Sequence, residues 1–251
     1  MDLTERFWNA SLTEMKQGYV QEQHHYICLL CGQSYEDGII YPENGVLYQA
    51  SKYIRVHVEK AHQSVFHYLI QMDKKLTGLT EHQNALLRQF YEGKSDAEVQ
   101  KELGIGSAST IRNHRFALKE KERQSKVFLA LMDLLKDNDR HAPAMVDVPK
   151  TARMVDERYN LTRKEYDEAI AKYFPQGTDG PLTTFHIQEK YKLVVLRELA
   201  SKFEPGRTYT EKEINEVLKA RYADFVTLRR YLIEYGFMDR KPDGSEYWIQ
   251  A

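Results

Sequence analysis

Two cysteines and two histidines near the start of the chain have the spacing C-x2-C-x25-H-x4-H: Cys28, Cys31, His57 and His62. Thiolates and imidazoles are the usual ligands of tetrahedral zinc. The cysteines lie in YICLLCG, where strands and a turn at Gly32 are expected, and the histidines lie in a segment expected to be helical. The spacing therefore predicts a zinc-finger-like α+β domain over residues 1–75 with a structural Zn2+.

Three other interpretations of this segment remain open. A CxxC pair also occurs in redox proteins, where it opens a helix after a strand, whereas a glycine and turn residues follow here. Two buried thiols would leave the paired histidines unexplained. His24, His25 or His67 could replace one of the two histidines as a ligand. His57 and His62 are five residues apart and do not share one helical stripe, so a kink or a loosening of the helix between them is expected.

Composition places the chain among cytoplasmic globular proteins. Apolar residues make up 42% and charged residues 29% of the 251 residues, and two cysteines are too few for a secreted disulfide scaffold. No apolar run is long enough to span a membrane, and the acidic, polar N-terminus does not resemble a signal peptide. We therefore expect a cytoplasmic location and no membrane partner.

The net charge of −1 conceals one basic stretch. Residues 107–126 contain six Lys or Arg and two Glu, a local charge of +4, whereas residues 1–79 have a net charge of −2. A concentrated basic stretch can bind a polyanion even when the whole chain is nearly neutral. The charge distribution therefore predicts nucleic-acid contact near residue 115 and argues against base reading by the N-terminal domain.

Residues 76–136 have the pattern of a helix-turn-helix domain with a long helical extension. Capped helices are expected after Thr80 and Ser95, and a glycine turn at 104–106 precedes a third helix with polar and basic exposed positions. Such a helix can enter the major groove of double-stranded DNA. The predicted DNA-binding residues are Ser107, Ser109, Thr110, Arg112, Asn113, Arg115 and Lys119.

The stretch GLTEHQNALLRQFYEGKSDAEVQKELGI, followed by STIRNH, resembles the helix-turn-helix of LuxR-type regulators and of sigma-factor region four. The resemblance covers about thirty-five residues and implies a bacterial transcription regulator. This chain has one residue more than the family pattern between Ile105 and Thr110. The extra residue predicts that the third helix starts later or sits differently in the groove.

The third helix is expected to continue past the usual end of such a domain. Residues 127–135 place several large apolar side chains at helical spacing. This apolar face either packs within the chain or joins two copies in a homodimer through the helix at 120–136. Dimers are common among helix-turn-helix proteins because they read paired half-sites.

The rest of the chain divides into a linker with short helices at 137–180 and a winged-helix-like domain at 181–251. Three amphipathic helices followed by a β-hairpin around Pro-Asp-Gly are expected in the second of these segments. A winged helix binds DNA or a protein partner, and this one has a net charge of only +1. The residues predicted for a possible second DNA contact are Thr227, Arg229, Arg230 and Arg240.

The stretches FEPGRTYTEKEINEVL, DFVTLRRYLIEYGFMDR and DGSEYW resemble a bacterial domain of unknown function that is often found C-terminal to LuxR-like helices. The resemblance covers most of residues 173–248 and again implies a bacterial transcription regulator. It implies no chemistry for the domain.

No sequence motif of catalysis is apparent, and a metal nuclease is the one enzyme class left open by the cysteine and histidine pattern. The predicted fold is mainly α. The predicted function is that of a non-enzymatic, sequence-specific transcription regulator that binds double-stranded DNA and contains zinc. The alternative is an adaptor that uses the same helices to bind RNA polymerase or another regulator.

Overall fold

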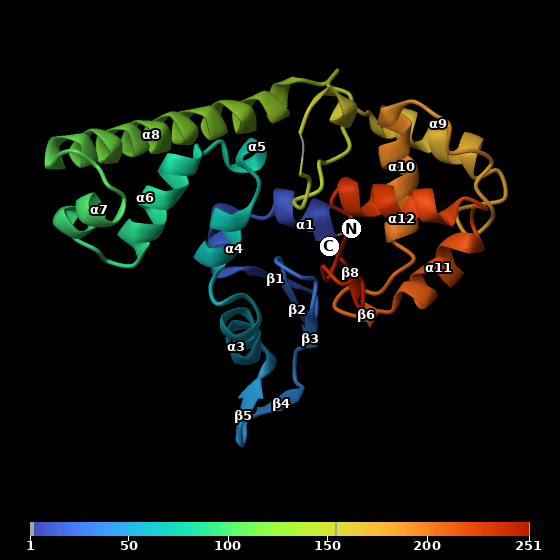
Figure 1. The fold of residues 1–251 in the computed structure, drawn as a ribbon, viewed down its shortest axis with the longest axis horizontal. Helices are drawn as coiled ribbons and strands as arrows, with labels where there is room; N and C mark the ends of the chain where they lie inside the picture. The colour runs from blue at the N-terminus through green and yellow to red at the C-terminus, as the bar shows by residue number, and fades with distance from the viewer. Residues whose placement is uncertain (1–2, 154, 251) are drawn as a thin grey trace. The chain divides into compact units, whose positions relative to one another are not determined.

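The computed structural model describes residues 3–153 and 155–250, which form two compact units (Figure 1). Unit 1 combines the described residues up to Leu76 with those from Ala144 onward, and unit 2 comprises Thr77–Pro143. Helices predominate and the sheets are small and antiparallel, which confirms the predicted fold class. No helix among the described residues is both long enough and apolar enough to cross a membrane.

The first half of unit 1, here called the N-terminal module, is an α+β structure that ends near Leu76. Its elements are α1 (Leu3–Asn9), α2 (Leu12–Gln17), β1 (Tyr19–Glu22), β2 (His25–Cys28), β3 (Ser34–Glu36), β4 (Ile40–Glu43), β5 (Val46–Gln49), α3 (Ala50–His62), α4 (Val65–Gln71) and α5 (Lys74–Thr77). Strands β1, β2 and β3 form one sheet, and β4 and β5 form a hairpin. Phe7, Ile27, Leu29 and Ile54 are buried together, so α1 and α3 share one core with the sheet.

Unit 2 is a three-helix structure with the helix-turn-helix order of elements. Its helices are α6 (Glu81–Tyr91), α7 (Asp96–Glu102) and α8 (Ala108–Asn138). Thr80 and Ser95 form capping boxes at the starts of α6 and α7, which satisfies backbone donors that would otherwise have no partner. A small core of Leu86, Val99, Ile105 and Ile111 joins the three helices.

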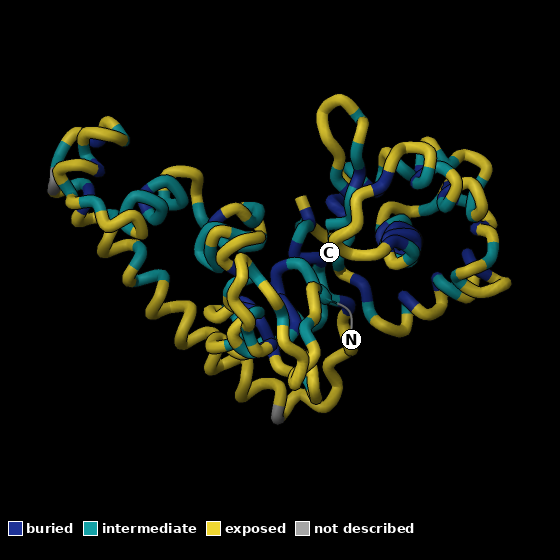
Figure 2. The backbone as a smooth tube through the Cα atoms, turned by 90° about the horizontal axis from the view of Figure 1, so that it is seen from below, coloured by how far each residue is buried: buried dark blue, intermediate teal, exposed yellow. Residues whose placement is uncertain are grey.

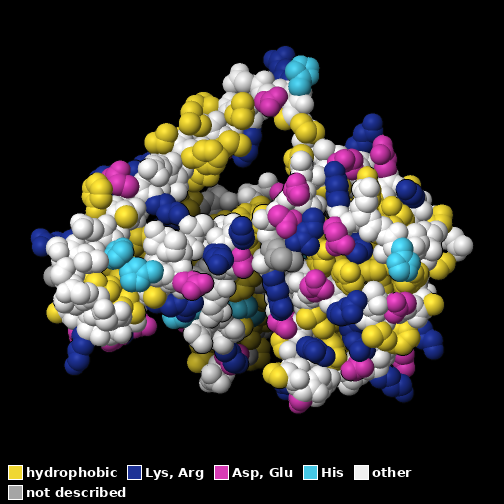
Figure 3. All heavy atoms as spheres, turned by 45° about the horizontal axis from the view of Figure 1, so that its top comes forward, with side chains coloured by type: hydrophobic (Ala, Val, Ile, Leu, Met, Phe, Trp, Pro, Cys, Tyr) yellow, Lys and Arg dark blue, Asp and Glu magenta, His cyan; other side chains and the backbone are white. Residues whose placement is uncertain are grey.

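Helix α8 extends well beyond this core, and its second half is covered by no other part of unit 2 (Figures 1 and 2). The large apolar side chains of residues 127–135 are 38–63% exposed. Figure 3 shows hydrophobic side chains gathered along this part of the helix. An apolar surface of this kind is uncommon on a monomer and usually marks an interaction site.

The second half of unit 1 contains a winged helix that runs from α10 to β8. The elements of this half are η1 (Glu157–Tyr159), α9 (Arg163–Tyr173), α10 (Glu189–Ala200), β6 (Thr208–Tyr209), α11 (Glu211–Lys219), α12 (Phe225–Glu234), β7 (Met238–Arg240) and β8 (Tyr247–Ile249). The expected hairpin is β7–β8, and the short strand β6 completes a sheet in the order β6-β8-β7. Leu196, Ile214, Leu228 and Leu232 have no exposed surface, so α10, α11 and α12 enclose the core of this domain.

Residues 145–153, here called the strap, come from the segment that was expected to be a linker. Several of them are buried, and Lys150 is 2% exposed. The strap bonds to the N-terminal module, because Trp8 Nε1 donates to the Val148 carbonyl at 2.6 Å. It also bonds to the winged helix, because an Arg197 guanidinium nitrogen donates to the Asp147 carbonyl at 3.2 Å. The strap therefore packs between the two halves of unit 1.

Gly236 shows how closely the strap packs on the winged helix. Its φ is +79°, and a Cβ atom added there would lie 2.3 Å from the Thr151 carbonyl oxygen. Gly206 has a similar φ of +77°, but its added Cβ would meet no described atom within 4 Å. We expect Gly236→Ala to lower the melting temperature by several degrees more than Gly206→Ala. Both variants incur the cost of a positive φ, about 1–2 kcal/mol, and only the first also displaces backbone.

Thermal unfolding followed by circular dichroism compares the two alanine variants with the unaltered chain. Equal melting temperatures for the two variants would contradict tight packing of the strap on Gly236.

Candidate metal centre and nucleic-acid interface

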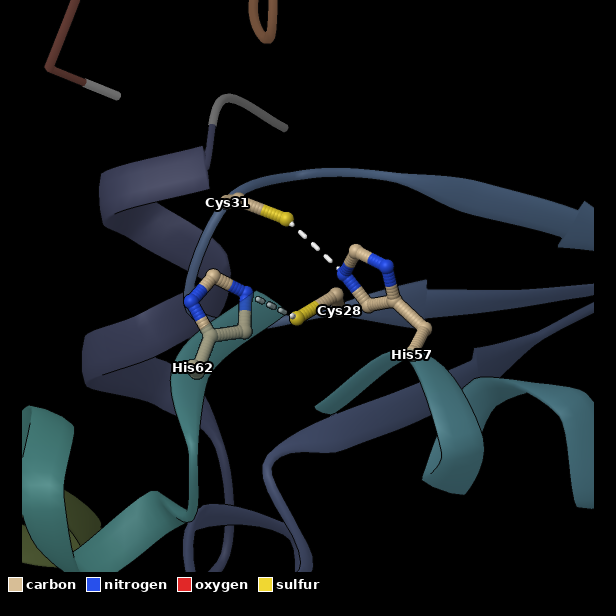
Figure 4. A group of neighbouring side chains, drawn as sticks. All are labelled: Cys28, Cys31, His57 and His62. Carbon is tan, nitrogen blue, oxygen red and sulfur yellow. Dashed lines mark hydrogen bonds between the residues drawn. The ribbon is translucent and has the colours of Figure 1, made fainter. Parts of the chain in front are cut away.

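The N-terminal module brings Cys28, Cys31, His57 and His62 together (Figure 4). Cys28 is the last residue of β2, and Cys31 follows in the turn after it. His57 lies within α3, and His62 is the last residue of that helix. The four side chains point toward one another from the strand end and the helix end.

A tight turn between the cysteines and β3 points both sulfurs to the same side. The Gly32 amide donates to the Cys28 carbonyl at 2.8 Å, and the Cys28 amide donates to the Gln33 carbonyl at 2.9 Å. Gly32 has φ +82°, a conformation that glycine adopts without steric cost. The glycine expected after the cysteine pair therefore closes the turn.

His57 and His62 come together because α3 ends at His62. The helix is continuous from His57 to His62, so the expected kink or loosening is not present. Five residues correspond to a rotation of about 140° around a helix, which separates His57 and His62 on its surface. The helix ends at His62, and Gln63 leaves it with φ +62°. Both imidazoles reach the cysteines because the sulfurs lie at the carboxyl end of the helix.

The distances within the cluster fit a tetrahedral ion. Cys28 Sγ lies 3.6 Å from His62 Nε2, and Cys31 Sγ lies 3.2 Å from His57 Nε2. All four ligand atoms lie within 4.8 Å of one another. Zinc bonds of about 2.3 Å to sulfur and 2.0–2.1 Å to nitrogen place a tetrahedral S···N pair about 3.6 Å apart. The cluster could therefore hold a metal ion with two thiolate and two imidazole ligands.

The two cysteine thiols affect each other's ionisation. The pKa of Cys31 is lowered chiefly by a hydrogen bond from the Cys28 thiol, and the pKa of Cys28 is raised by the same bond and by burial. Thiolates are the ligating form of cysteine, so metal binding at this cluster would release protons from the thiols.

Aromatic rings line the cluster on two sides. The Tyr35 ring centroid lies 5.6 Å from that of His57, and the Tyr68 centroid lies 6.0 Å from that of His62. His67 lies outside the four-residue cluster, with Nδ1 2.8 Å from Ser64 Oγ. His24 and His25 are also outside the cluster, so none of the three alternative ligands is needed to complete it.

Lys150 from the strap lies against the turn between the cysteines and was not foreseen from the sequence. Its Nζ donates to the Leu29 and Leu30 carbonyls, each at 2.8 Å. Burial lowers the pKa of Lys150 to about 7, and the nearby Cys28 and Cys31 partly oppose this shift. A cleft of about 640 Å³ borders both Lys150 and Cys31. No local signal in VDVPKTA marks this lysine, because its acceptors are some 120 residues earlier in the chain.

In unit 2, the predicted DNA-binding residues at the start of α8 have two different roles. Ser107 is the N-cap, and its Oγ accepts from the Thr110 amide at 3.3 Å. The helix thus begins at Ala108, after the turn that follows α7. Ser109, Arg112 and Asn113 are exposed, whereas Ile111 among them is buried in the core of unit 2.

Arg115 and Lys119 differ from Arg112 because each has an acidic partner. Arg115 forms an ion pair with Asp96 at 2.7 Å, and its guanidinium lies 3.6 Å from the Phe90 ring centroid. These contacts attach α8 to α6 and α7, so Arg115 stabilises unit 2. Lys119 pairs with Glu122 at 2.7 Å on the surface of α8. Exposed pairs like this one are weak, so Lys119 can exchange partners.

Of the four residues predicted for a second DNA contact, two make contacts within the winged helix and two are exposed. Arg229 pairs with Glu211 at 2.8 Å and is 14% exposed, so its charge is used inside the domain. The Thr227 amide donates to Asp224 at the start of α12, and the Thr227 side chain is half-buried. Arg230 on α12 and Arg240 on β7 are exposed.

Comparison with known proteins identifies one domain of the chain. Residues 181–249 match the family described as an uncharacterized protein conserved in bacteria, DUF2087. The matched segment covers the winged helix from α10 to β8. The chain matches no curated protein and no solved structure. The family is one of unknown function, so the match assigns no activity to the domain.

Proposed function

We propose that the protein is a sequence-specific transcription regulator that binds double-stranded DNA through unit 2 and carries a structural zinc ion in unit 1. The observation that carries the first part is the exposed start of α8 in a helix-turn-helix arrangement. Side chains at the start of such a helix are the ones that reach base edges in the major groove. The proposal assigns no catalytic reaction to the chain.

Arg112 and Asn113 are the best-placed base-reading residues. Both are exposed, and the Arg112 side chain forms no hydrogen bond or ion pair with a described residue. Arginine makes bidentate contacts to guanine and asparagine to adenine, each worth about 1–3 kcal/mol of discrimination between bases. Lys119 and Lys126 follow on α8 and would contact phosphate, consistent with the local charge of +4.

Zinc is the metal that best fits the ligand set of the N-terminal module. Two thiolates and two imidazoles, closed by protein on all four positions, are typical of structural zinc sites. A redox role fits less well, because Cys28 ends a strand and has no exposed surface. Metal analysis of the purified protein tests the zinc assignment, and less than about half an equivalent per chain would contradict a structural site.

Binding to random-sequence duplex DNA at low and moderate salt tests the DNA assignment. A protein that neutralises several phosphates loses affinity steeply as salt rises, because binding releases counterions. We expect measurable affinity at low salt that falls in this manner. No affinity, or affinity that does not change with salt, would contradict the proposal.

A specific observation supports an adaptor as the second candidate. Phe116 is 64% exposed and lies near Asn113 on the outer face of α8. An exposed aromatic ring beside polar residues suits a protein surface such as that of RNA polymerase. Salt-independent binding to the polymerase, without binding to duplex DNA, would favour the adaptor over the regulator.

We further propose that the second half of α8 joins two chains in a homodimer. Its apolar side chains are exposed within unit 2, and burying a leucine fully contributes about 1.5–3 kcal/mol. We expect the chain to sediment as a dimer and a Leu131→Glu plus Leu134→Glu variant to sediment as a monomer. Ala117→Glu, in the first half of the same helix, should leave the dimer intact.

Sedimentation velocity over a range of protein concentrations measures the oligomeric state of the unaltered protein, the double variant and Ala117→Glu. The dimer assignment is wrong if the unaltered protein remains a monomer, or if the double variant still dimerises.

A further inference from the structure

Lys150 is the most deeply buried charged side chain that the described residues contain, and it lies beside the candidate metal centre. It is 2% exposed, whereas the other described Lys, Arg, Asp and Glu residues all have more exposed surface. Its two acceptors, the Leu29 and Leu30 carbonyls, belong to the two residues between Cys28 and Cys31. The lysine thus holds the chain segment that separates two proposed metal ligands.

The surroundings of the Lys150 ammonium are otherwise apolar or aromatic. Nζ lies 5.7 Å from the Phe7 ring centroid and 5.6 Å from that of Tyr68. It forms no ion pair with a carboxylate of the described residues. A buried charge without such a partner is costly unless hydrogen bonds and nearby negative charge compensate for it. The Leu29 and Leu30 carbonyls supply the hydrogen bonds that compensate for the burial here.

The strap also connects this lysine to the winged helix. Arg153 pairs with Asp239 at 3.3 Å, and Thr151 Oγ1 lies 3.5 Å from the Gln250 carbonyl oxygen. The Thr151 carbonyl packs on Gly236, as described above. Residues on either side of Lys150 are therefore fixed to the DUF2087 domain, while its side chain is fixed to the cysteine turn.

We propose that Lys150 is a positioning residue of the metal centre and couples metal binding to the docking of the strap and the DUF2087 domain. This inference rests on the proposed zinc site. When a metal holds both sulfurs, the turn between them presents the Leu29 and Leu30 carbonyls in the orientation that Lys150 needs. In return, the two hydrogen bonds from the ammonium stabilise that turn and so hold both sulfurs in place for the metal. Such a coupling acts equally in both directions.

The first test compares Lys150→Met with Lys212→Met in the full chain. Methionine keeps an apolar stem in the buried position, and Lys212 is an exposed lysine on α11. Competition with a chelator measures the dissociation constant for Co2+. Loss of residues that support metal ligands typically weakens binding by about 10–100-fold, and we expect a weakening in this range for Lys150→Met alone. The thiolate-to-cobalt absorption should persist at saturation, since all four ligands remain.

The second test starts from the unaltered chain. Hydrogen exchange followed by mass spectrometry reports the protection of strap amides in the unaltered chain with and without bound metal. We expect metal removal to increase exchange in the strap. In metal-saturated Lys150→Met, the strap should exchange faster while β2 and α3 remain protected, which separates release of the strap from unfolding of the N-terminal module.

Two results would overturn the coupling. One is an unchanged Co2+ affinity in a folded Lys150→Met variant, and the other is strap protection that does not depend on metal in the unaltered chain. Either would leave the zinc site itself intact. Failure of the unaltered chain to bind Co2+ or Zn2+ would instead refute the metal site, and the role of Lys150 with it.

Discussion

A Cys28→Ser variant is expected to lose its zinc and the folded structure of the N-terminal module, while unit 2 keeps its helices. Cys28 has no exposed surface and packs in the same core as Phe7, Ile27 and Leu29. Structural zinc contributes about 10–16 kcal/mol of apparent binding free energy in finger peptides, more than a small module can replace. The loss of one ligand should therefore unfold the module. Unit 2 should persist because its core contains no residue of the module.

Metal analysis and near-ultraviolet circular dichroism measure the two effects. The module contains many tyrosines, including the cluster of Tyr35, Tyr41 and Tyr53, so its unfolding should remove much of the aromatic signal. His62→Ala should also lower both the zinc content and the aromatic signal. His24→Ala is the matched control, because His24 is exposed and outside the cluster. Full zinc content and an unchanged aromatic signal in Cys28→Ser would show that the thiol is an ordinary core residue.

Local sequence patterns predicted the candidate metal centre well. The spacing of Cys28, Cys31, His57 and His62 identified four side chains that the fold brings together. The sequence did not reveal how the two histidines meet, because the answer depends on where α3 ends. Gln63 ends the helix with a positive φ, and glutamine is not a residue that favours this conformation. Tertiary packing, rather than local preference, determines that boundary.

Helices and hairpins were also predictable, because their signals are local. Thr80 and Ser95 mark the starts of helices that the structure contains, and the Pro-Asp-Gly turn marks the β7–β8 hairpin. The strand β6 has only two residues, Thr208 and Tyr209, and forms through pairing with β8 nearly forty residues later. A strand of two residues is too short to show an alternating pattern of apolar and polar residues in the sequence.

The use of individual charges could not be predicted from the sequence. Arg112, Arg115 and Arg229 look alike in a count of basic residues, yet Arg115 and Arg229 each form an ion pair with an acidic residue of their own domain. Their partners, Asp96 and Glu211, lie 19 and 18 residues earlier in the chain and on other helices. Periodicity shows which face of a helix is polar, but it does not show what that face meets.

This distinction between paired and unpaired arginines determines the expected effects on DNA binding. Arg112→Ala should weaken binding to a specific site by about 1–3 kcal/mol, roughly 5- to 150-fold, because it removes a base contact without altering the fold. Asn113→Ala should have an effect of similar size. Lys164→Ala is the matched control, since Lys164 is an exposed cation in unit 1.

Arg115→Ala should behave differently from Arg112→Ala. Its guanidinium pairs with Asp96 and stacks on Phe90, so its loss should lower the thermal stability of unit 2. Arg112 has no such contacts, and its replacement should leave the melting temperature unchanged. A double substitution of both arginines would mix the two effects, so the single variants are the informative ones.

Fluorescence anisotropy on a duplex selected from a random pool, at several salt concentrations, measures these affinities. A base contact by Arg112 predicts that Arg112→Ala loses affinity for the selected duplex and much less for an unrelated one. If Arg112 contacts phosphate instead, affinity should fall equally on both duplexes and the salt slope should decrease by about 1. Unchanged affinity and salt dependence in Arg112→Ala and Asn113→Ala would contradict recognition by α8, because these two side chains are the proposed base-reading residues.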